Sequence, residues 1–267
     1  GDLGGNTNYE AITTTEQVTI TNDTLGSIST SEDITITQLA TVAMDMEWLT
    51  DDFNDNTEDT VKWPWSNNYG TGCTRAETGG QVVFTAGSVS TNGGSKYKDD
   101  IHGLIGSYAY VELVSIVGAN ANGAALFEIE LTPEDDNQTY VRFYLYNGGL
   151  SMQYAVDWAQ TEVAWISYNT TDHRWLRIRE SGGSIYWDTA PDGLTWTNRA
   201  SVTNPFAMTN VYPLFGIQQW ATPVSDYVVT FDNFNTPATI TDINISISDD
   251  LTITENVSED IDFSVSV

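Results

Sequence analysis

Short runs of alternating apolar and polar residues recur through the middle of this chain, and turn signals separate them. The runs are VRFYLY, LSMQYAV, WLRIR, SIYWDT and YVVTF, at 141–146, 150–156, 175–179, 184–189 and 227–231. Their two-residue period is typical of β-strands. The turns NGG, SGG and PDG contain glycine, which supplies the positive φ of tight hairpins. With no sustained helical period, the sequence predicts an all-β antiparallel sandwich of about ten or more strands.

Composition divides the chain into three regions. Residues 44–237 hold all nine tryptophans, whereas residues 1–43 and 238–267 are rich in Thr, Ser, Ile and acidic residues. We therefore expect one aromatic-rich domain over 44–237, flanked by two segments of a different kind.

The flanking segments carry a repeat. EQVTIT and EDITIT begin at Glu16 and Glu32, and DDLTIT and EDIDFS begin at Asp249 and Glu259. Each copy is a short strand with one apolar face, which must stack on a neighbour to be stable. Two interpretations remain open: a fibrous stalk that self-associates through these repeats, or an ordinary β-sandwich linker. We also expect the chain to be a piece of a longer polypeptide.

The charge balance excludes two classes of partner. The chain has 37 acidic and 9 basic residues, for a net charge of −28. A polyanionic surface repels nucleic acid and anionic membranes. No apolar run reaches the roughly 18–20 residues that span a bilayer, so membrane insertion is not expected. Cys73 is the one cysteine, which excludes an intrachain disulfide.

Three stretches together resemble a known superfamily. They are DDFNDNTEDTVKW at 51–63, HRWLRIRESGGSIYWDTAPDGLTW at 173–196 and VVTFDNF at 228–234. Residues 44–237 resemble the concanavalin A-like lectin/glucanase superfamily, in its laminin-G-like branch of bacterial and viral surface proteins. The resemblance implies a jelly roll whose first and last strands are adjacent. More loosely, the flanks resemble the Ser/Thr-rich repeats of phage fibres and bacterial surface proteins.

Adjacent terminal strands would gather oxygen donors at one edge. Asp52, Asn54 and Asn56 share a face if their segment is extended, and Asp232 would join them. Carboxylate and amide oxygens suit Ca²⁺, and related jelly-roll modules often hold a structural ion there, so we expect a structural calcium site. The alternative is that these residues cap turns at a solvated edge.

A second group of residues predicts a ligand-binding face. In VRFYLY the residues Val141, Phe143 and Leu145 form the apolar face, so Arg142, Tyr144 and Tyr146 point the other way. This face resembles the concave surface that such folds use for glycans, because aromatic rings stack on sugars and polar groups bond their hydroxyls. We expect Gln153, Gln219 and Trp220 to extend it.

Catalysis is not expected from the sequence. Some members of the superfamily cleave β-glucans with acids spaced ExDxxE. Glu128 and Glu130 share a strand face here, but Thr132 follows where a third acid would continue the pattern. His102 and His173 lie in no recognisable nucleophile motif.

The sequence therefore predicts a non-enzymatic, extracellular, lectin-like module on a virion fibre or cell surface, binding a glycan or surface ligand. The alternative is a structural decoration or filament subunit that assembles through its flanks.

Overall fold

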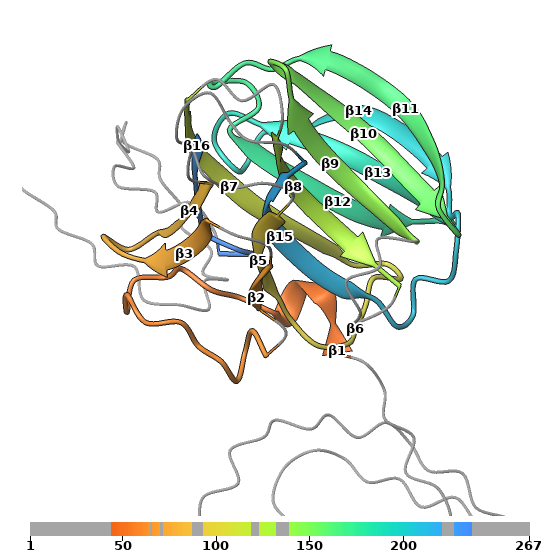
Figure 1. Cartoon of the computed structure of the whole chain (residues 1–267). Helices are drawn as coiled ribbons and strands as arrows, with labels where there is room; N and C mark the ends of the chain where they lie inside the picture. The colour runs from red at the N-terminus through yellow and green to blue at the C-terminus, as the bar shows by residue number, and fades with distance from the viewer. Residues whose placement is uncertain are drawn as a thin grey trace, which may run out of the picture.

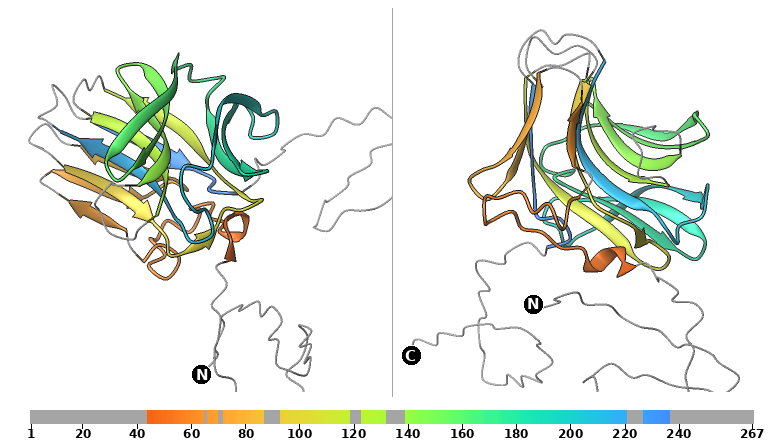
Figure 2. Two further views of the ribbon diagram at one scale, coloured as in Figure 1. Left: turned by 90° about the vertical axis from the view of Figure 1, so that its right-hand side faces the viewer. Right: turned by 60° about the horizontal axis from the view of Figure 1, so that its bottom comes forward.

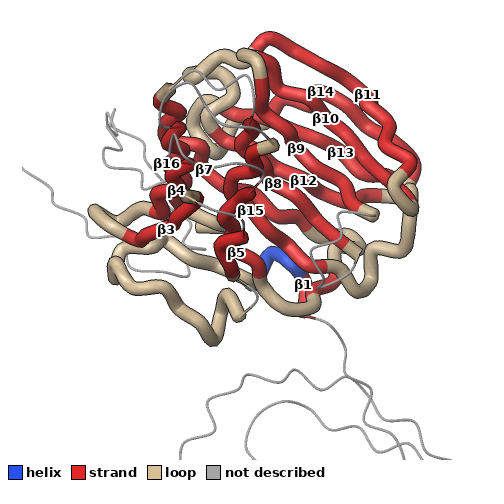
Figure 3. The backbone as a smooth tube through the Cα atoms, viewed as in Figure 1, coloured by secondary structure: helices blue, strands red, loops and turns tan. Residues whose placement is uncertain are grey.

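The computed structural model describes residues 44–64, 66–69, 72–86, 93–118, 123–131, 139–220 and 227–236 (Figure 1). Strands dominate this part of the chain, and its helical content is the single 3-10 turn η1 (Met46–Trp48) (Figure 3). Two curved seven-stranded sheets form the layers of a sandwich (Figures 1 and 2).

Sheet I has seven strands paired antiparallel throughout. Its order is β11 (Ala159–Ser167), β10 (Gly149–Val156), β9 (Tyr140–Tyr146), β8 (Gly123–Glu130), β15 (Tyr212–Gln219), β5 (Gly93–Lys98) and β2 (Asn67–Tyr69).

Sheet II is also antiparallel. Its order is β14 (Thr197–Thr203), β13 (Ser184–Ala190), β12 (Trp175–Ser181), β7 (Tyr108–Val117), β16 (Tyr227–Asp232), β4 (Val82–Ala86) and β3 (Cys73–Glu77). A small parallel pair, β1 (Met44–Asp45) with β6 (His102–Gly103), lies outside both sheets.

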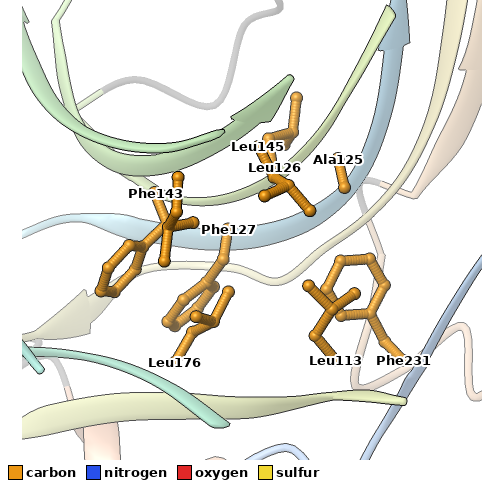
Figure 4. A pocket seen from close by; sticks show the side chains of 9 residues that line it. Leu113, Ala125, Leu126, Phe127, Phe143, Leu145, Leu176 and Phe231 are labelled. Carbon is orange, nitrogen blue, oxygen red and sulfur yellow. The ribbon is translucent and has the colours of Figure 1, made fainter. Parts of the chain in front are cut away.

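The core fills the space between the two sheets. Alternate residues of each strand point inward, as the period-two pattern predicts, so Phe127 and Phe143 of sheet I meet Leu113, Leu176 and Phe231 of sheet II (Figure 4). All five are at most 2% exposed. The same alternation turns the residues between them outward, and this places the polar and aromatic side chains of both outer faces.

The two ends of the aromatic-rich domain are joined. Asp51 and Phe234 exchange backbone N–H···O bonds of 2.9 and 2.8 Å. The Trp63 indole donates to the Asp51 carboxylate at 2.7 Å, and Phe53 and Phe234 are fully buried. The adjacency of DDFNDN and FDNF that the resemblance implied is thus confirmed.

The predicted all-β antiparallel sandwich is confirmed, and the five strands expected from alternation appear as β9, β10, β12, β13 and β16. Tight turns occur at Asn147–Gly148 and Gly182–Gly183, where all four residues have positive φ. The repeats of 1–43 and 238–267 lie outside the described residues, so the domain boundaries and the expected self-association stay predictions. No helix in the described ranges is long and apolar enough to cross a membrane.

Candidate functional site

The outer face of sheet I, turned away from the core, carries aromatic and charged side chains in rows that cross the strands. Strand register defines three rows. The first is Trp165, Ser151, Tyr144, Leu126, Gly216 and Lys96; the second is Glu162, Gln153, Arg142, Glu128, Leu214 and Lys98; the third is Ala155, Tyr140, Glu130 and Tyr212.

Two ion pairs occupy the middle of this face. Lys98 Nζ contacts Glu130 Oε2, and Arg142 Nη1 lies 3.3 Å from Glu128 Oε2. Glu128 and Glu130 are neighbouring outward positions of β8, so their Cα atoms are about 6.6 Å apart. Each carboxylate thus has its own cationic partner, supplied by a different strand.

The acidic pair, Glu128 and Glu130, is desolvated and incompletely bonded. The two residues are 1% and 2% exposed. Oε1 of each is buried and accepts no hydrogen bond from the described residues. Buried polar atoms normally have a partner, because an unpartnered one costs about 1–3 kcal/mol. Two such acceptors side by side can receive hydroxyl donors from a ligand.

Burial and the adjacent Glu128 carboxylate raise the pKa of Glu130 well above its usual range, while Lys96 and Lys98 oppose the shift. Glu128 has Arg142 as its direct cationic partner. The arrangement therefore places a carboxyl group with a raised pKa next to a carboxyl group that is paired with an arginine. This is the combination that acid-assisted chemistry requires.

An aromatic surface flanks the acidic pair. Tyr144 stacks on Trp220 with ring centroids 6.4 Å apart and planes 25° apart, and it packs against Tyr146 at 5.4 Å. The Arg142 guanidinium lies 4.1 Å from the Tyr144 ring centre. Burial raises the pKa of Tyr144 to about 12, so its hydroxyl keeps its proton near neutral pH.

Trp165 adds an exposed ring at the other side of this face, 48% exposed. It lies directly over Gly149: a Cβ atom on Gly149 would come within 2.1–2.2 Å of the indole. Glycine at this hairpin position is therefore what lets the indole lie against the strand.

Gln153 is held in a polar chain. Its amide nitrogen donates to Ser151 Oγ at 2.9 Å, and the Ser151 hydroxyl donates to Glu162 Oε2 at 2.6 Å. The side-chain carbonyl oxygen of Gln153 accepts from Arg142 Nε at 3.1 Å and from the Gln160 amide at 2.9 Å. The orientation of the Arg142 side chain is thus fixed from both flanks.

The structure brings together five of the six residues predicted for ligand binding: Arg142, Tyr144, Tyr146, Gln153 and Trp220. Gln219 is not among them. It follows Ile217 on the core-facing side of β15 and is 1% exposed, because adjacent strand residues point to opposite faces. Sequence reasoning identified Glu128 and Glu130 but discounted them, and it missed Lys98.

The four predicted calcium ligands have protein partners of their own. Asp52 Oδ1 accepts from the Asn54 N–H at 3.2 Å, and Asn56 Oδ1 accepts from the Gly80 N–H at 2.8 Å. Asp232 accepts from the Asn233 N–H at 2.8 Å and from a Gln81 amide at 3.3 Å. The contacts of Asp52 and Asp232 with the backbone N–H groups that follow them are the turn-capping role of the alternative interpretation, whereas the contacts with Gly80 and Gln81 join separate segments.

No group of three or more Asp, Glu, His or Cys suited to a metal occurs among the described residues. Burial raises the pKa of Asp232 to about 6, with Glu112 and Asp52 adding to the shift. Calcium binding by these residues stays a prediction.

The histidines lie elsewhere. His102 Nε2 is 2.6 Å from Asp99 Oδ2, and both residues are buried, Asp99 directly after β5 and His102 in β6. His173 Nδ1 accepts from the Asn169 N–H at 3.0 Å inside a turn. Neither residue belongs to the outer face of sheet I.

No protein-family model and no curated protein sequence matches this chain. Solved structures of similar fold do exist. A prokaryotic β-1,3-1,4-glucanase (lichenase) from a mouse hindgut metagenome has a TM-score of 0.52 at 10% identity, covering 69% of this chain and 96% of that one. A laminarinase from Flavobacterium sp. UMI-01 has a TM-score of 0.50 at 9% sequence identity, and the match covers 69% of this chain and 96% of that one. A non-specific endo-β-1,3(4)-glucanase of family GH16 has a TM-score of 0.50 at 6% identity, and the match covers 69% of this chain and 88% of that one.

These neighbours confirm the concanavalin A-like jelly-roll fold. They contradict two predictions: that the module is a non-catalytic lectin-like domain or structural subunit, and that it is not an enzyme. The similar structures are glycoside hydrolases, so absence of the three-acid signature was insufficient ground to set catalysis aside. At this identity the likeness establishes the fold alone, and any activity must be argued from this chain's own residues. The phage-fibre and laminin-G setting stays a prediction.

Proposed function

We propose that this protein is a glycoside hydrolase that cleaves a β-linked glucan on the outer face of sheet I. The observation that carries the proposal is the acidic pair. Glu128 and Glu130 lie side by side at the centre of the sheet, and each retains a buried oxygen without a hydrogen-bond partner in the described part of the chain. The glucanase names of the structural neighbours support the choice of substrate class.

The two carboxyl groups divide the chemistry. Glu130, whose pKa is raised, donates its proton to the glycosidic oxygen as the C1–O bond breaks. Glu128, paired with Arg142, attacks C1 and forms a glycosyl ester. Glu130 then takes a proton from water, whose oxygen bonds to C1 and releases Glu128. Both groups return to their starting protonation states.

The spacing of the pair predicts the stereochemistry. Inverting enzymes need roughly 6.5–9.5 Å between carboxyl groups to admit a water, whereas retaining enzymes use about 5–5.5 Å. Neighbouring outward residues of one strand fit the shorter spacing. We therefore expect retention of the anomeric configuration.

The aromatic residues position the substrate. Tyr144, Trp220 and Trp165 present rings that can stack on pyranose faces along the row next to the acidic pair. Gln153 and Arg142 supply polar contacts from the middle row. A polymeric substrate also fits the extracellular location expected from the sequence, which is part of this proposal.

The test is hydrolysis of laminarin and of mixed-linkage β-glucan by the full chain, measured as the release of reducing ends. We expect activity that falls at least about 100-fold in Glu128→Gln and in Glu130→Gln. Proton NMR of the first product should show the β-anomer.

Glu112→Gln is the matched control. Glu112 is also a buried carboxylate, 5% exposed and 2.5 Å from Arg174 Nε, but it lies on sheet II. It should retain the wild-type rate once folding is verified by circular dichroism. Failure to cleave either glucan, or an unchanged rate in Glu128→Gln, would overturn the proposal.

A further inference from the structure

The outer face of sheet II carries a second, separate set of aromatic and charged residues. Arg177 and Arg179 are successive outward residues of β12, since Leu176 and Ile178 point into the core. Around them lie the rings of Tyr108, Tyr110, Tyr186 and Trp196. We call Arg177, Arg179 and these four rings the arginine–aromatic patch.

Each guanidinium of the patch stacks on a ring. Arg177 lies 4.2 Å from the Trp196 ring centre, and Arg179 lies 4.0 Å from that of Tyr186. Tyr110 packs on Trp196 at 5.6 Å and stacks on Tyr108 at 5.8 Å. Stacking fixes the planes of the two guanidinium groups while leaving their edges accessible.

The loop before β14 builds one side of the patch. A Cβ atom on Gly193 would lie 3.0 Å from the Trp175 indole, and Gly193 has φ of +73°. This close approach lets the loop fold back over Trp175 and place Trp196 on Arg177. The patch is therefore a packed arrangement rather than a set of free surface chains.

One carboxylate serves both arginines. Asp188 Oδ2 accepts from Arg177 Nε at 3.1 Å and Nη2 at 2.8 Å, and from Arg179 Nε at 2.7 Å. Asp188 is 1% exposed, and its other oxygen accepts from the Asn198 amide at 2.9 Å. Two cations against one carboxylate leave a positive charge.

The remaining donors face outward. Arg177 Nη1 and both Nη atoms of Arg179 have no hydrogen-bond partner in the described structure, and the side chains are 19% and 29% exposed. In a chain of net charge −28, four of the nine basic residues fall between Arg174 and Arg199. The positive charge is thus concentrated in the β12–β14 region.

We propose that the arginine–aromatic patch is a second carbohydrate-binding site, selective for an anionic polysaccharide. Guanidinium edges bind sulfate or carboxylate groups with two parallel hydrogen bonds. The adjacent Trp196, Tyr108 and Tyr186 rings offer flat surfaces for the sugar. Charge complementarity selects a polyanion over a neutral glycan. The site lies on the sheet opposite the acidic pair and does not depend on the proposed hydrolase activity.

The experiment measures binding of three polymers with one backbone: dextran, carboxymethyl dextran and dextran sulfate. Titration calorimetry in 150 mM salt restricts electrostatics to about 8 Å and so reports local charge rather than the global −28. We expect dextran sulfate and carboxymethyl dextran to bind and dextran not to bind.

Variants locate the site. Arg179→Gln should weaken dextran sulfate binding about tenfold. Arg179→Lys should weaken it less, because lysine keeps the positive charge but lacks the two parallel N–H donors of the guanidinium group. Trp196→Ala should also weaken binding. Trp220→Ala, which changes the outer face of sheet I, should leave it unchanged. Glucan hydrolysis by Arg179→Gln should match wild type.

Three results would overturn the inference. They are binding of neutral dextran as tight as that of the anionic polymers, no binding of either anionic polymer, and binding that Arg179→Gln and Trp196→Ala leave intact. Circular dichroism on each variant separates loss of the site from loss of fold. Because the readout is binding, a failure of glucan hydrolysis would leave this result interpretable.

Discussion

The indole of Trp187 links the two sheets beneath the candidate active face. Trp187 belongs to β13 of sheet II and is fully buried. Its Nε1–H donates across the core to the backbone carbonyl of Arg142 in sheet I, at 3.0 Å. Arg142 in turn pairs with Glu128 on the opposite side of that sheet. Trp187→Phe therefore tests whether this cross-sheet bond stabilises the fold.

The expected loss can be worked from these contacts. Removing a buried hydrogen bond costs about 0.5–1.5 kcal/mol. Phenylalanine is smaller than tryptophan by roughly 40 Å³, which at about 24 cal/mol per Å³ adds about 1 kcal/mol for a cavity that does not collapse. Lost burial of the missing ring atoms adds a further fraction. We expect Trp187→Phe to lower the free energy of unfolding by about 2–3 kcal/mol.

The assay is urea unfolding followed by far-ultraviolet circular dichroism, with the slope of free energy against urea required to match wild type. Trp48→Phe is the matched control: Trp48 is 66% exposed, so its change should stay within about 0.5 kcal/mol. A loss below about 1 kcal/mol for Trp187→Phe, or equal losses for both variants, would refute the reasoning.

Three other predictions concern the glycine under the indole, a buried acid and the predicted metal. Gly149→Ala should displace Trp165 and raise KM for glucan several-fold with kcat little changed, because the new methyl group would lie within 2.1–2.2 Å of the ring; unchanged kinetics would contradict this. Burial raises the pKa of Glu77 from 4.5 to about 7. The stability that comes from the tighter proton binding of Glu77 in the folded state is therefore complete below about pH 4.5 and is lost as the pH rises through about 7. Glu77→Gln should therefore flatten the dependence of Tm on pH between 5 and 8, and an unaltered slope would count against this assignment. Calcium titration of chelator-treated protein should release or absorb heat if Asp52 and Asp232 bind the ion; a flat trace with an unchanged Tm would remove the prediction.

The parts of this structure that the sequence predicts are those set by local alternation. In the run from Val141 to Tyr146, the two-residue period correctly separates core residues from the outward Arg142, Tyr144 and Tyr146. Gln219 shows the limit of this reasoning. It was paired with Trp220 by proximity in sequence, although a strand turns adjacent residues to opposite faces.

The parts that could not be predicted depend on contacts between distant segments. Lys98 reaches Glu130 from a strand 32 residues earlier, and only the strand order of sheet I brings them together. The raised pKa of Glu130 follows from burial that no single-sequence pattern reports. The edge strands β11 and β14 were missed because they are polar and mostly exposed, so they lack the apolar face that marks a strand.

The backbone exchange between Asp51 and Phe234 makes the described domain a loop that closes on itself. Asp51 and Phe234, a few residues from its two ends, are separated by the width of one strand pair, about 5 Å. A domain of this kind can be grafted into a surface loop of an unrelated host without stretching either protein. It can likewise be carried as an insert that a longer polypeptide gains or loses whole.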